Sequence, residues 1–434
     1  MKRQSLLLSL FICVLASSCL PAAAPTPLPG VLFVDPGTSL GLISPYLYGT
    51  NYGPMHAVPP EMMSLVEDAG FTVLRFPGGA WTDAVDMQSF QIDMLMTFAR
   101  QVGAMPTISV RLLGGEPETA AELVRYTNIE KKYGVTYWSI GNEPSIYTQL
   151  NQADYDYTTE HLNQDWRAIA VAMKKADPTI KLMGPEIHQW NDSLETTPKD
   201  SAGRDWMTEF LKANGDLVDV VSVHRYPLHS PTRPVSVQDL RENTRKWVSE
   251  VEYLRRLIRE VVGRDLPIAI TEVNSDPSSA MLQDASPDSF YNAIWYADVL
   301  GQLMHADVFM VNQWVVSQRT TGLGLLQGTT VRPSFYVFPL YKNFGSEQVY
   351  AASGAADVDI FAAKREDGAL TLMVINLSDT QQQIPLQVKG RQLSEAEIWR
   401  LDAAHNAENL GMQPLLVNDN VVLPAQSATL YVLP

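Results

Sequence analysis

The stretch "VTYWSIGNEP", residues 135–144, decides the fold. Its first part is rich in β-branched and aromatic residues, as is typical of a buried strand, and it ends in Asn142-Glu143-Pro144. A loop glutamate usually does no more than face solvent. The meaning of Glu143 therefore depends on which strand of which sheet it follows.

Eight segments from residue 46 onward have strand character and alternate with longer segments of helical periodicity. The strand candidates are 46–53, 72–79, 106–115, 135–144, 180–187, 219–227, 267–275 and 307–316. Eight such units predict an α/β (β/α)₈ barrel over residues 46–345. A doubly wound open sheet is the alternative, but no Gly-rich dinucleotide fingerprint follows the first strand.

Beyond the barrel the helical period stops, and short alternating runs such as "ALTLMVINLS" continue to the end of the chain. Residues 346–434 are therefore predicted to form a small all-β sandwich. The segment 31–45, which precedes the barrel, is expected to add a strand to it, since chain ends often lie close together.

The N-terminus carries Lys2 and Arg3, an apolar run and the small residues before Cys19. Residues 1–18 are expected to be a signal peptide of the bacterial lipoprotein type, with Cys19 lipidated, although Ala16 stands where such signals usually have Leu. Ordinary secretion is the alternative. The Pro-rich segment 19–30 reads as an extended tether, and the protein is expected to be exported and membrane-bound only through this anchor.

The charge balance restricts the partners. Lys and Arg total 32 against 48 Asp and Glu, and removal of the signal peptide leaves a formal charge of −18. Because no basic run occurs, nucleic acid and anionic membrane surfaces are excluded as expected partners. The oligomeric state stays open. Both cysteines, Cys13 and Cys19, lie in the N-terminal segment, so the domains are expected to stand without disulfides.

Two carboxylates are placed by strand counting at the carboxyl ends of strands, where barrels of this kind have their active sites. Glu143 ends the fourth strand and Glu272 ends the seventh. By alternation, Glu272 shares one strand face with Ile268 and Ile270, and we expect it to converge on Glu143. Cleavage of a glycosidic bond requires such a pair, one residue as acid and one as nucleophile or base.

These features resemble the glycoside hydrolases of clan A, which are retaining (β/α)₈ enzymes; families 39, 51, 79 and 30 are the most similar. The resemblance extends over nearly the whole chain after the signal segment, and the C-terminal β module fits it too. It implies that Glu143 is the acid/base and Glu272 the nucleophile. It also implies substrate contacts for five further residues: Arg75 beside the nucleophile, Asn142 at the sugar 2-hydroxyl, His224 and Tyr226 at the cleaved subsite, and Trp314 under the sugar ring.

The resulting hypothesis is a retaining glycosidase acting on xylan, arabinan or β-glucan by double displacement, without cofactor. The first rival is a non-catalytic carbohydrate-binding lipoprotein with the same fold. The second is a metal-dependent barrel hydrolase, although the seven histidines are scattered and no cluster has ligand spacing. For the two glutamates and Arg75 the alternative role is a structural ion pair.

Some positions stay unassigned. The third strand ends in "RLLGG" (111–115) and shows no polar residue assignable to substrate, while Glu116 and Glu118 follow it. Three more residues near strand ends, His188, Trp81 and Trp190, have no defined role, and packing is the simpler reading for the two tryptophans. Because Arg225 should point away from the barrel interior and Arg75 is engaged by carboxylates, neutral sugars are favoured over uronates.

Overall fold

The structure of the protein, a computed structural model, describes residues 27–228, 233–278 and 281–434. The predicted signal peptide, Cys19 and the tether up to residue 26 lie outside the described residues. No helix within the described ranges is long and apolar enough to span a membrane.

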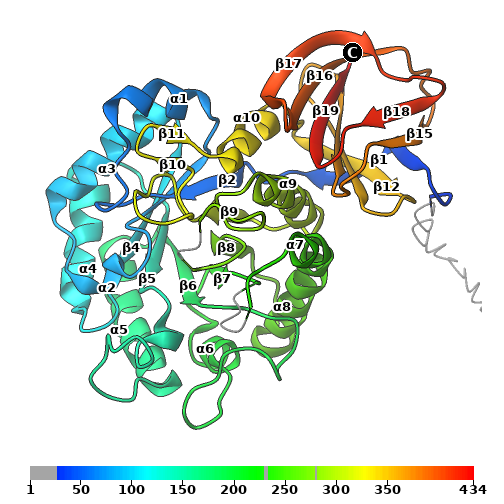
Figure 1. Ribbon diagram of the computed structural model, residues 1–434. Helices are drawn as coiled ribbons and strands as arrows, with labels where there is room; N and C mark the ends of the chain where they lie inside the picture. Colours follow the sequence, from blue (N-terminus) through cyan, green and yellow to red (C-terminus); the bar gives the residue numbers. More distant parts are fainter. Residues whose placement is uncertain (1–26, 229–232, 279–280) are drawn as a thin grey trace, which may run out of the picture.

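A closed barrel of eight parallel strands forms the centre of the molecule (Figure 1). Its strands are β2 (Tyr46–Asn51), β3 (Val73–Phe76), β4 (Met105–Val110), β5 (Tyr137–Ile140), β6 (Lys181–Ile187), β7 (Val220–Arg225), β8 (Ile268–Val273) and β9 (Met310–Gln313). Each lies within a predicted segment or within one residue of it, which confirms the predicted barrel. β5 ends before Asn142 because Gly141 and Glu143 both have a positive φ, which extended backbone does not allow.

Helices surround the barrel and cover the outer faces of its strands (Figure 1). They are α1 (Met63–Asp68), α2 (Trp81–Ala84), α3 (Ser89–Val102), α4 (Pro117–Val124), α5 (Thr159–Ala176), α6 (Trp206–Asn214), α7 (Val237–Asn243), α8 (Trp247–Val262), α9 (Phe290–His305) and α10 (Val337–Lys342). Their caps follow the sequence: Asp205, Ser236 and Ser289 accept N-terminal backbone N–H groups of α6, α7 and α9.

The barrel strands bury two separate apolar surfaces. Outward residues such as Trp138, Ile268 and Ile270 join the large core beneath the helices. Inward residues near the amino ends of the strands form a small interior layer. That layer consists of Val73, Met183, Val220, Ala269 and Met310, with Tyr46, Met105, Tyr137 and Phe309 packed against it. Apolar side chains therefore fill the barrel interior at the amino ends of the strands, and an active site is expected at the carboxyl ends.

The C-terminal module is a mostly antiparallel sheet beside α9 and α10 (Figure 1). Its strands are β12 (Glu347–Ser353), β13 (Val358–Lys364), β14 (Leu370–Asn376), β15 (Gln382–Val388), β16 (Glu395–Asp402), β17 (His405–Pro414), β18 (Asn420–Leu423) and β19 (Ser427–Leu433). The N-terminal strand β1 (Leu32–Leu42) pairs with β12 and β15 in the same sheet. Hydrogen bonding links all nine strands, so the two faces of this sandwich-like module belong to one continuous sheet around its own core.

Candidate active site

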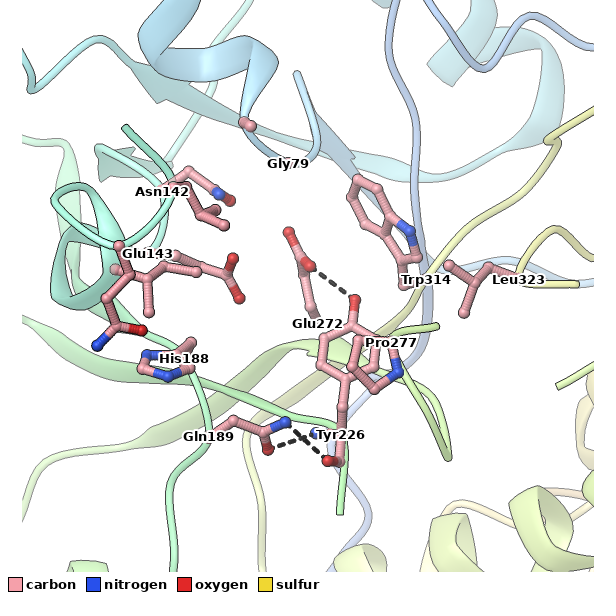
Figure 2. Close-up of a pocket in the computed structure, with 14 residues that line it drawn as sticks. Gly79, Asn142, Glu143, His188, Gln189, Tyr226, Glu272, Pro277, Trp314 and Leu323 are labelled. Carbon is pink, nitrogen blue, oxygen red and sulfur yellow. Dashed lines mark hydrogen bonds between the residues drawn. The ribbon is translucent and has the colours of Figure 1, made fainter. Parts of the chain in front are cut away.

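A cavity of about 450 Å³ opens at the carboxyl ends of the barrel strands. Five of the residues expected at the site line it: Asn142, Glu143, Tyr226, Glu272 and Trp314. Figure 2 shows the Glu143 and Glu272 carboxyl groups facing one another across this cavity. The order of the strands thus places these residues at the carboxyl end of the barrel, where barrels of this kind have their active sites.

Glu143 follows β5 in a left-handed conformation, with φ 50°. For a residue with a Cβ this costs roughly 1–2 kcal/mol. The backbone N–H of Glu143 donates to the Glu186 carbonyl oxygen at 3.0 Å, which ties the end of β5 to β6. This turn aims the carboxylate across the mouth of the barrel rather than along the strand (Figure 2).

Glu272 reaches the interior through a break in strand alternation. Ala269 belongs to the interior layer, whereas Ile268 and Ile270 belong to the helix-facing core, so strict alternation would turn Glu272 outward. The registers of β8 with both neighbours shift just before this residue, and its two carboxyl-end side chains, Thr271 and Glu272, both face the site. The expectation that alternation alone brings Glu272 inward was therefore wrong; a register shift does so.

The two carboxyl groups are close together. One oxygen of Glu143, one oxygen of Glu272 and a ring nitrogen of His224 all lie within 4.8 Å of one another. Retaining glycosidases hold their carboxyl groups about 5–5.5 Å apart, whereas inverting enzymes need about 6.5–9.5 Å to admit a water molecule. The spacing of the nearest oxygens, within 4.8 Å, lies on the short side of these two ranges.

Glu272 is held by two donors. Arg75 Nη1 donates to its Oε1 at 2.8 Å and the Tyr226 hydroxyl donates to its Oε2 at 2.7 Å. Arg75 Nη2 donates in turn to the Asn142 side-chain oxygen at 2.9 Å. The Asn142 amide nitrogen has no hydrogen-bond partner among the described residues, so it can donate into the cavity, as a contact to a sugar hydroxyl requires.

Arg75 and His224 were expected among the substrate-binding residues, but both side chains are fully buried and neither lines the cavity. They lie behind the carboxylates. Arg75 Nη2 also lies 3.6 Å from Glu186 Oε2. Burial alone would lower the pKa of Arg75, but the negative charges of Glu186 and Glu272 outweigh burial and raise it. These two cations therefore act on the carboxylates, and reach a sugar only through them.

His224 bridges two carboxylates. Its Nδ1 lies 2.9 Å from Glu143 Oε1 and its Nε2 lies 2.9 Å from Glu186 Oε2. Burial alone lowers the pKa of His224, but the charges of Glu272, Glu143 and Glu186 outweigh burial and raise it to about 9. At neutral pH the imidazole is doubly protonated and donates from both nitrogens.

The two catalytic candidates differ in their pKa values. Burial raises the pKa of Glu272, and the nearby charges of His224 and Arg75 only partly offset this. Burial also acts on Glu143, but the hydrogen bond and charge of His224 outweigh it and lower the pKa of Glu143. The charge of His224 thus favours the ionised form of Glu143 across their hydrogen bond.

Glu186, on β6, is a functional residue that the sequence reasoning missed. It is fully buried and accepts hydrogen bonds from Ser139 at 2.5 Å, from Thr271 and from His224. Burial raises its pKa, but Arg75 and His224 outweigh burial and lower it to about 2. A glutamate within the otherwise apolar stretch 182–187 was the available signal.

Asp83, in α2, was missed as well. Its buried carboxylate accepts the backbone N–H groups of Leu112, Leu113 and Asn142 at 2.8, 3.1 and 2.9 Å, and the Tyr147 hydroxyl at 2.7 Å. It thereby joins the end of β4 to the catalytic loop after β5. No local pattern indicated this role, because the partners come from other strands.

Trp314 follows β9 and forms one wall of the cavity (Figure 2). Gly79, with φ 71°, lies against its ring, and a Cβ there would come within 2.4 Å of the indole. The close approach fixes the plane of the ring at the cavity wall, as an aromatic platform for a sugar requires.

The unassigned positions are now placed. His188 lines the cavity and its Nδ1 lies 2.8 Å from the Ser145 hydroxyl. Trp190 is buried and donates to the Glu250 carbonyl, which is a packing role. Trp81 lies in α2, and does not line the cavity. Glu116 and Glu118 lie at the start of α4, outside the cavity, and Glu118 pairs with Arg125 on the surface.

A metal ion fits this site poorly. Glu143, His224 and Glu272 are the one group of described residues whose ligand atoms cluster closely enough. A ligating imidazole must offer an unprotonated nitrogen, yet both ring nitrogens of His224 contact carboxylate oxygens and its pKa is raised to about 9. In this arrangement His224 donates to two carboxylates, and it would have to lose a proton before it could ligate a metal ion.

A closed parallel barrel whose fourth and seventh strands present facing glutamates defines the clan A class of glycoside hydrolases. Residues 119–385, which include both glutamates, match the model of glycosyl hydrolases family 39. That segment is more than half of the chain, and the protein belongs to this family.

Known relatives are distant. The intracellular exo-α-(1→5)-L-arabinofuranosidase of Streptomyces lividans is 23% identical over 251 residues, which are 44% of this chain and 36% of that protein. The chain thus matches about a third of that relative's length.

Solved structures share the fold over nearly the full chain. A bifunctional glucanase-xylanase from a metagenome library covers 94% of this chain and all of its own, with 19% identity and a TM-score of 0.71. An α-L-arabinofuranosidase from Thermotoga maritima covers 93% of this chain and 99% of its own, with 18% identity and the same TM-score. These similarities show the fold.

Proposed function

We propose that the protein is a retaining glycosidase that cleaves glycosidic bonds by double displacement. The observation that carries this is the close approach of the Glu143 and Glu272 carboxyl oxygens, within 4.8 Å, at the carboxyl ends of strands four and seven of the barrel. Arg75 and Tyr226 donate to Glu272 and favour its ionised form, which a nucleophile requires, against the effect of burial.

In the first step, Glu272 attacks the anomeric carbon and forms a covalent glycosyl ester. Glu143, carrying the proton shared with His224, protonates the leaving oxygen as its bond to that carbon breaks. In the second step a water molecule attacks the anomeric carbon, Glu143 accepts its proton, and the ester bond to Glu272 breaks. Atoms and protons balance without a cofactor.

Two features support neutral sugars of the xylan, arabinan or β-glucan type. Among the residues that the structure describes, those that line the cavity include no Lys or Arg. Arg75 is engaged by carboxylates behind the wall, and Arg225 points outward to Glu250 on α8, with Nε to Oε2 at 3.0 Å. A uronate in the cavity would meet two carboxylates without a free cation beside it.

The test of retention is the anomer that is released first. Aryl glycosides of xylose, arabinofuranose and glucose are screened, and the active one is followed by proton NMR from the first minute. The expected product has the anomeric configuration of the substrate and mutarotates later. Release of the opposite anomer would refute double displacement, and binding without release of any sugar would favour a carbohydrate-binding protein.

We further propose that the chain is exported and anchored through Cys19. The support is the N-terminal pattern of basic residues, apolar run and small residues before this cysteine. Expression of the full chain in a bacterium with labelled palmitate tests it: label is expected in the unaltered protein and not in Cys19→Ala. Labelling of both would refute the site.

A further inference from the structure

A second cavity, of about 550 Å³, lies beside the catalytic one. Ala80 lines both cavities, and so does the loop after β5: Leu150 faces the catalytic cavity, whereas Gln152 and Asp154 face the second. We infer that the second cavity is a subsite for a further neutral sugar unit of the chain that the catalytic site cleaves. The inference rests on the proposed glycosidase function.

Tyr155 supplies a platform in this cavity. Its side chain is 46% exposed, although large apolar residues are usually covered. The rings of His161 and Tyr157 lie behind it, with centroids 5.3 and 6.1 Å away. An aromatic ring that is backed by other rings and open on one side can stack on the C–H face of a sugar at little entropic cost.

Arg111 supplies directed donors. Its Nε donates to the Leu113 carbonyl at 2.8 Å, which orients the guanidinium, and its Nη1 lies 3.6 Å from Asp86. Its Nη2 makes no hydrogen bond to the residues that the structure describes, and a Cβ on Gly114, where φ is 65°, would lie 3.3 Å from it. Glycine at this position keeps the approach to the guanidinium open.

Acceptors complete the set. Gln152 and Asp154 are exposed, line the cavity, and have no side-chain hydrogen bond within the described part of the chain. Asp83 also lines the cavity, so one arginine faces two carboxylates there. The cavity offers both hydrogen-bond donors and acceptors, and it has no excess of positive charge. Such a lining suits the hydroxyl groups of a neutral sugar better than the carboxylate of a uronate.

The two cavities are coupled through Asp83. Its carboxylate binds the backbone N–H of Leu112, beside Arg111, and that of Asn142, beside Glu143. A sugar held by Arg111 is therefore positioned on the same rigid framework as the acid/base. Arg111 is the polar residue at the end of the third strand to which the sequence alone assigned no substrate contact.

The test uses unsubstituted oligosaccharides of two to six units from the xylo, arabino and cello series. For the series that is cleaved, kcat/KM is expected to rise about tenfold when the chain first fills both cavities. Tyr155→Ala and Arg111→Met should each reduce this gain to about twofold. The matched control is Phe90→Ala, which removes another exposed aromatic ring, 60% exposed and outside both cavities, and should keep the full gain.

Binding of the same oligosaccharides to Glu272→Gln, followed by calorimetry, gives a readout that does not need turnover. The affinity is expected to rise with chain length, and Tyr155→Ala in that background should remove the rise. The second subsite would be overturned if the gain with chain length stayed the same in both Tyr155→Ala and Arg111→Met. It would also be overturned if the unaltered protein showed no gain with chain length. If the unaltered protein binds these oligosaccharides with the same length dependence but cleaves none of them, the proposed glycosidase is overturned and the subsite stands.

Discussion

The lower and upper halves of the barrel interior are built by the same strands from opposite kinds of residue. The lower layer contains Val73 and Val220 and is apolar. Two residues further along β3 the inward side chain is Arg75, and four further along β7 it is His224, both fully buried. The inward side chains thus change from apolar packing residues to charged residues of the site within two to four positions along a strand.

The halves also differ in their regularity. Pairing is regular along the lower parts of β7 and β8, whereas registers shift where Glu186, His224 and Glu272 enter the site. A regular barrel presents every second residue, which suits a packed plug. Irregular strand ends bring in side chains that alternation would turn outward, which allows one arginine and one histidine to contact three glutamates.

Among the substitutions that compare the two halves, Glu272→Gly in the upper half should cause the largest loss of turnover. Turnover is expected to fall about 10⁵-fold, because no residue replaces the nucleophile. Added azide should restore activity and yield a glycosyl azide, identified by mass spectrometry. Folding is checked by thermal denaturation; a folded variant that azide does not rescue would contradict the assignment.

Glu143→Ala should cost about 10³-fold on substrates with poor leaving groups. The loss should be much smaller with dinitrophenyl glycosides, whose leaving oxygen needs no proton. Steady-state rates on the two substrate types measure the ratio. Glu118→Ala, on the surface at the start of α4, is the control and should leave both rates unchanged; equal losses on both substrates in Glu143→Ala would argue against an acid role.

Met310→Ala tests the lower layer. The side chain is fully buried between β2 and β8, so its truncation should lower the free energy of unfolding by about 3 kcal/mol. The kcat of the folded protein should stay unchanged, since the layer contacts no substrate. Denaturant titration and kinetics at low temperature separate the two effects, and a large fall in kcat would show that the halves are not independent.

Among the three glutamates of the upper half, Glu186 should have the smallest effect on rate when it is replaced. Glu186→Gln should lower the rate only about tenfold but should shift the pH dependence of the rate. Glu186 raises the proton affinity of the Glu143–His224 pair, whose His224 has a pKa of about 9. Removing this negative charge makes loss of the shared proton easier, so the alkaline limb of kcat/KM should move to lower pH.

The matched control for Glu186→Gln is Glu250→Gln. Glu250 is also buried and paired with an arginine, but it faces Arg225 outside the barrel interior. It should lower stability without moving either limb of the pH profile. If both variants shift the alkaline limb alike, Glu186 has no special position in the proton network.

Much of the site could be predicted from local pattern. Strand counting placed Glu143 and Glu272 at the ends of the fourth and seventh strands. The resemblance assigned Arg75 to the neighbourhood of Glu272 and Tyr226 to the cleaved subsite. Glu186 was missed because a glutamate in an apolar run does not reveal what it pairs with. The same holds for Asp83, whose partners lie at the ends of other strands.

The sequence by itself determined the eight strands, their order and the end of the barrel at which Glu143 and Glu272 lie, because hydrophobic period and chain order are local properties. The tertiary structure decided that Glu272 faces inward, that Arg75 and His224 lie behind the carboxylates, and that Arg111 borders a second cavity. These features depend on register and burial between strands distant in the chain, where a shift of one residue reverses the face that a side chain occupies.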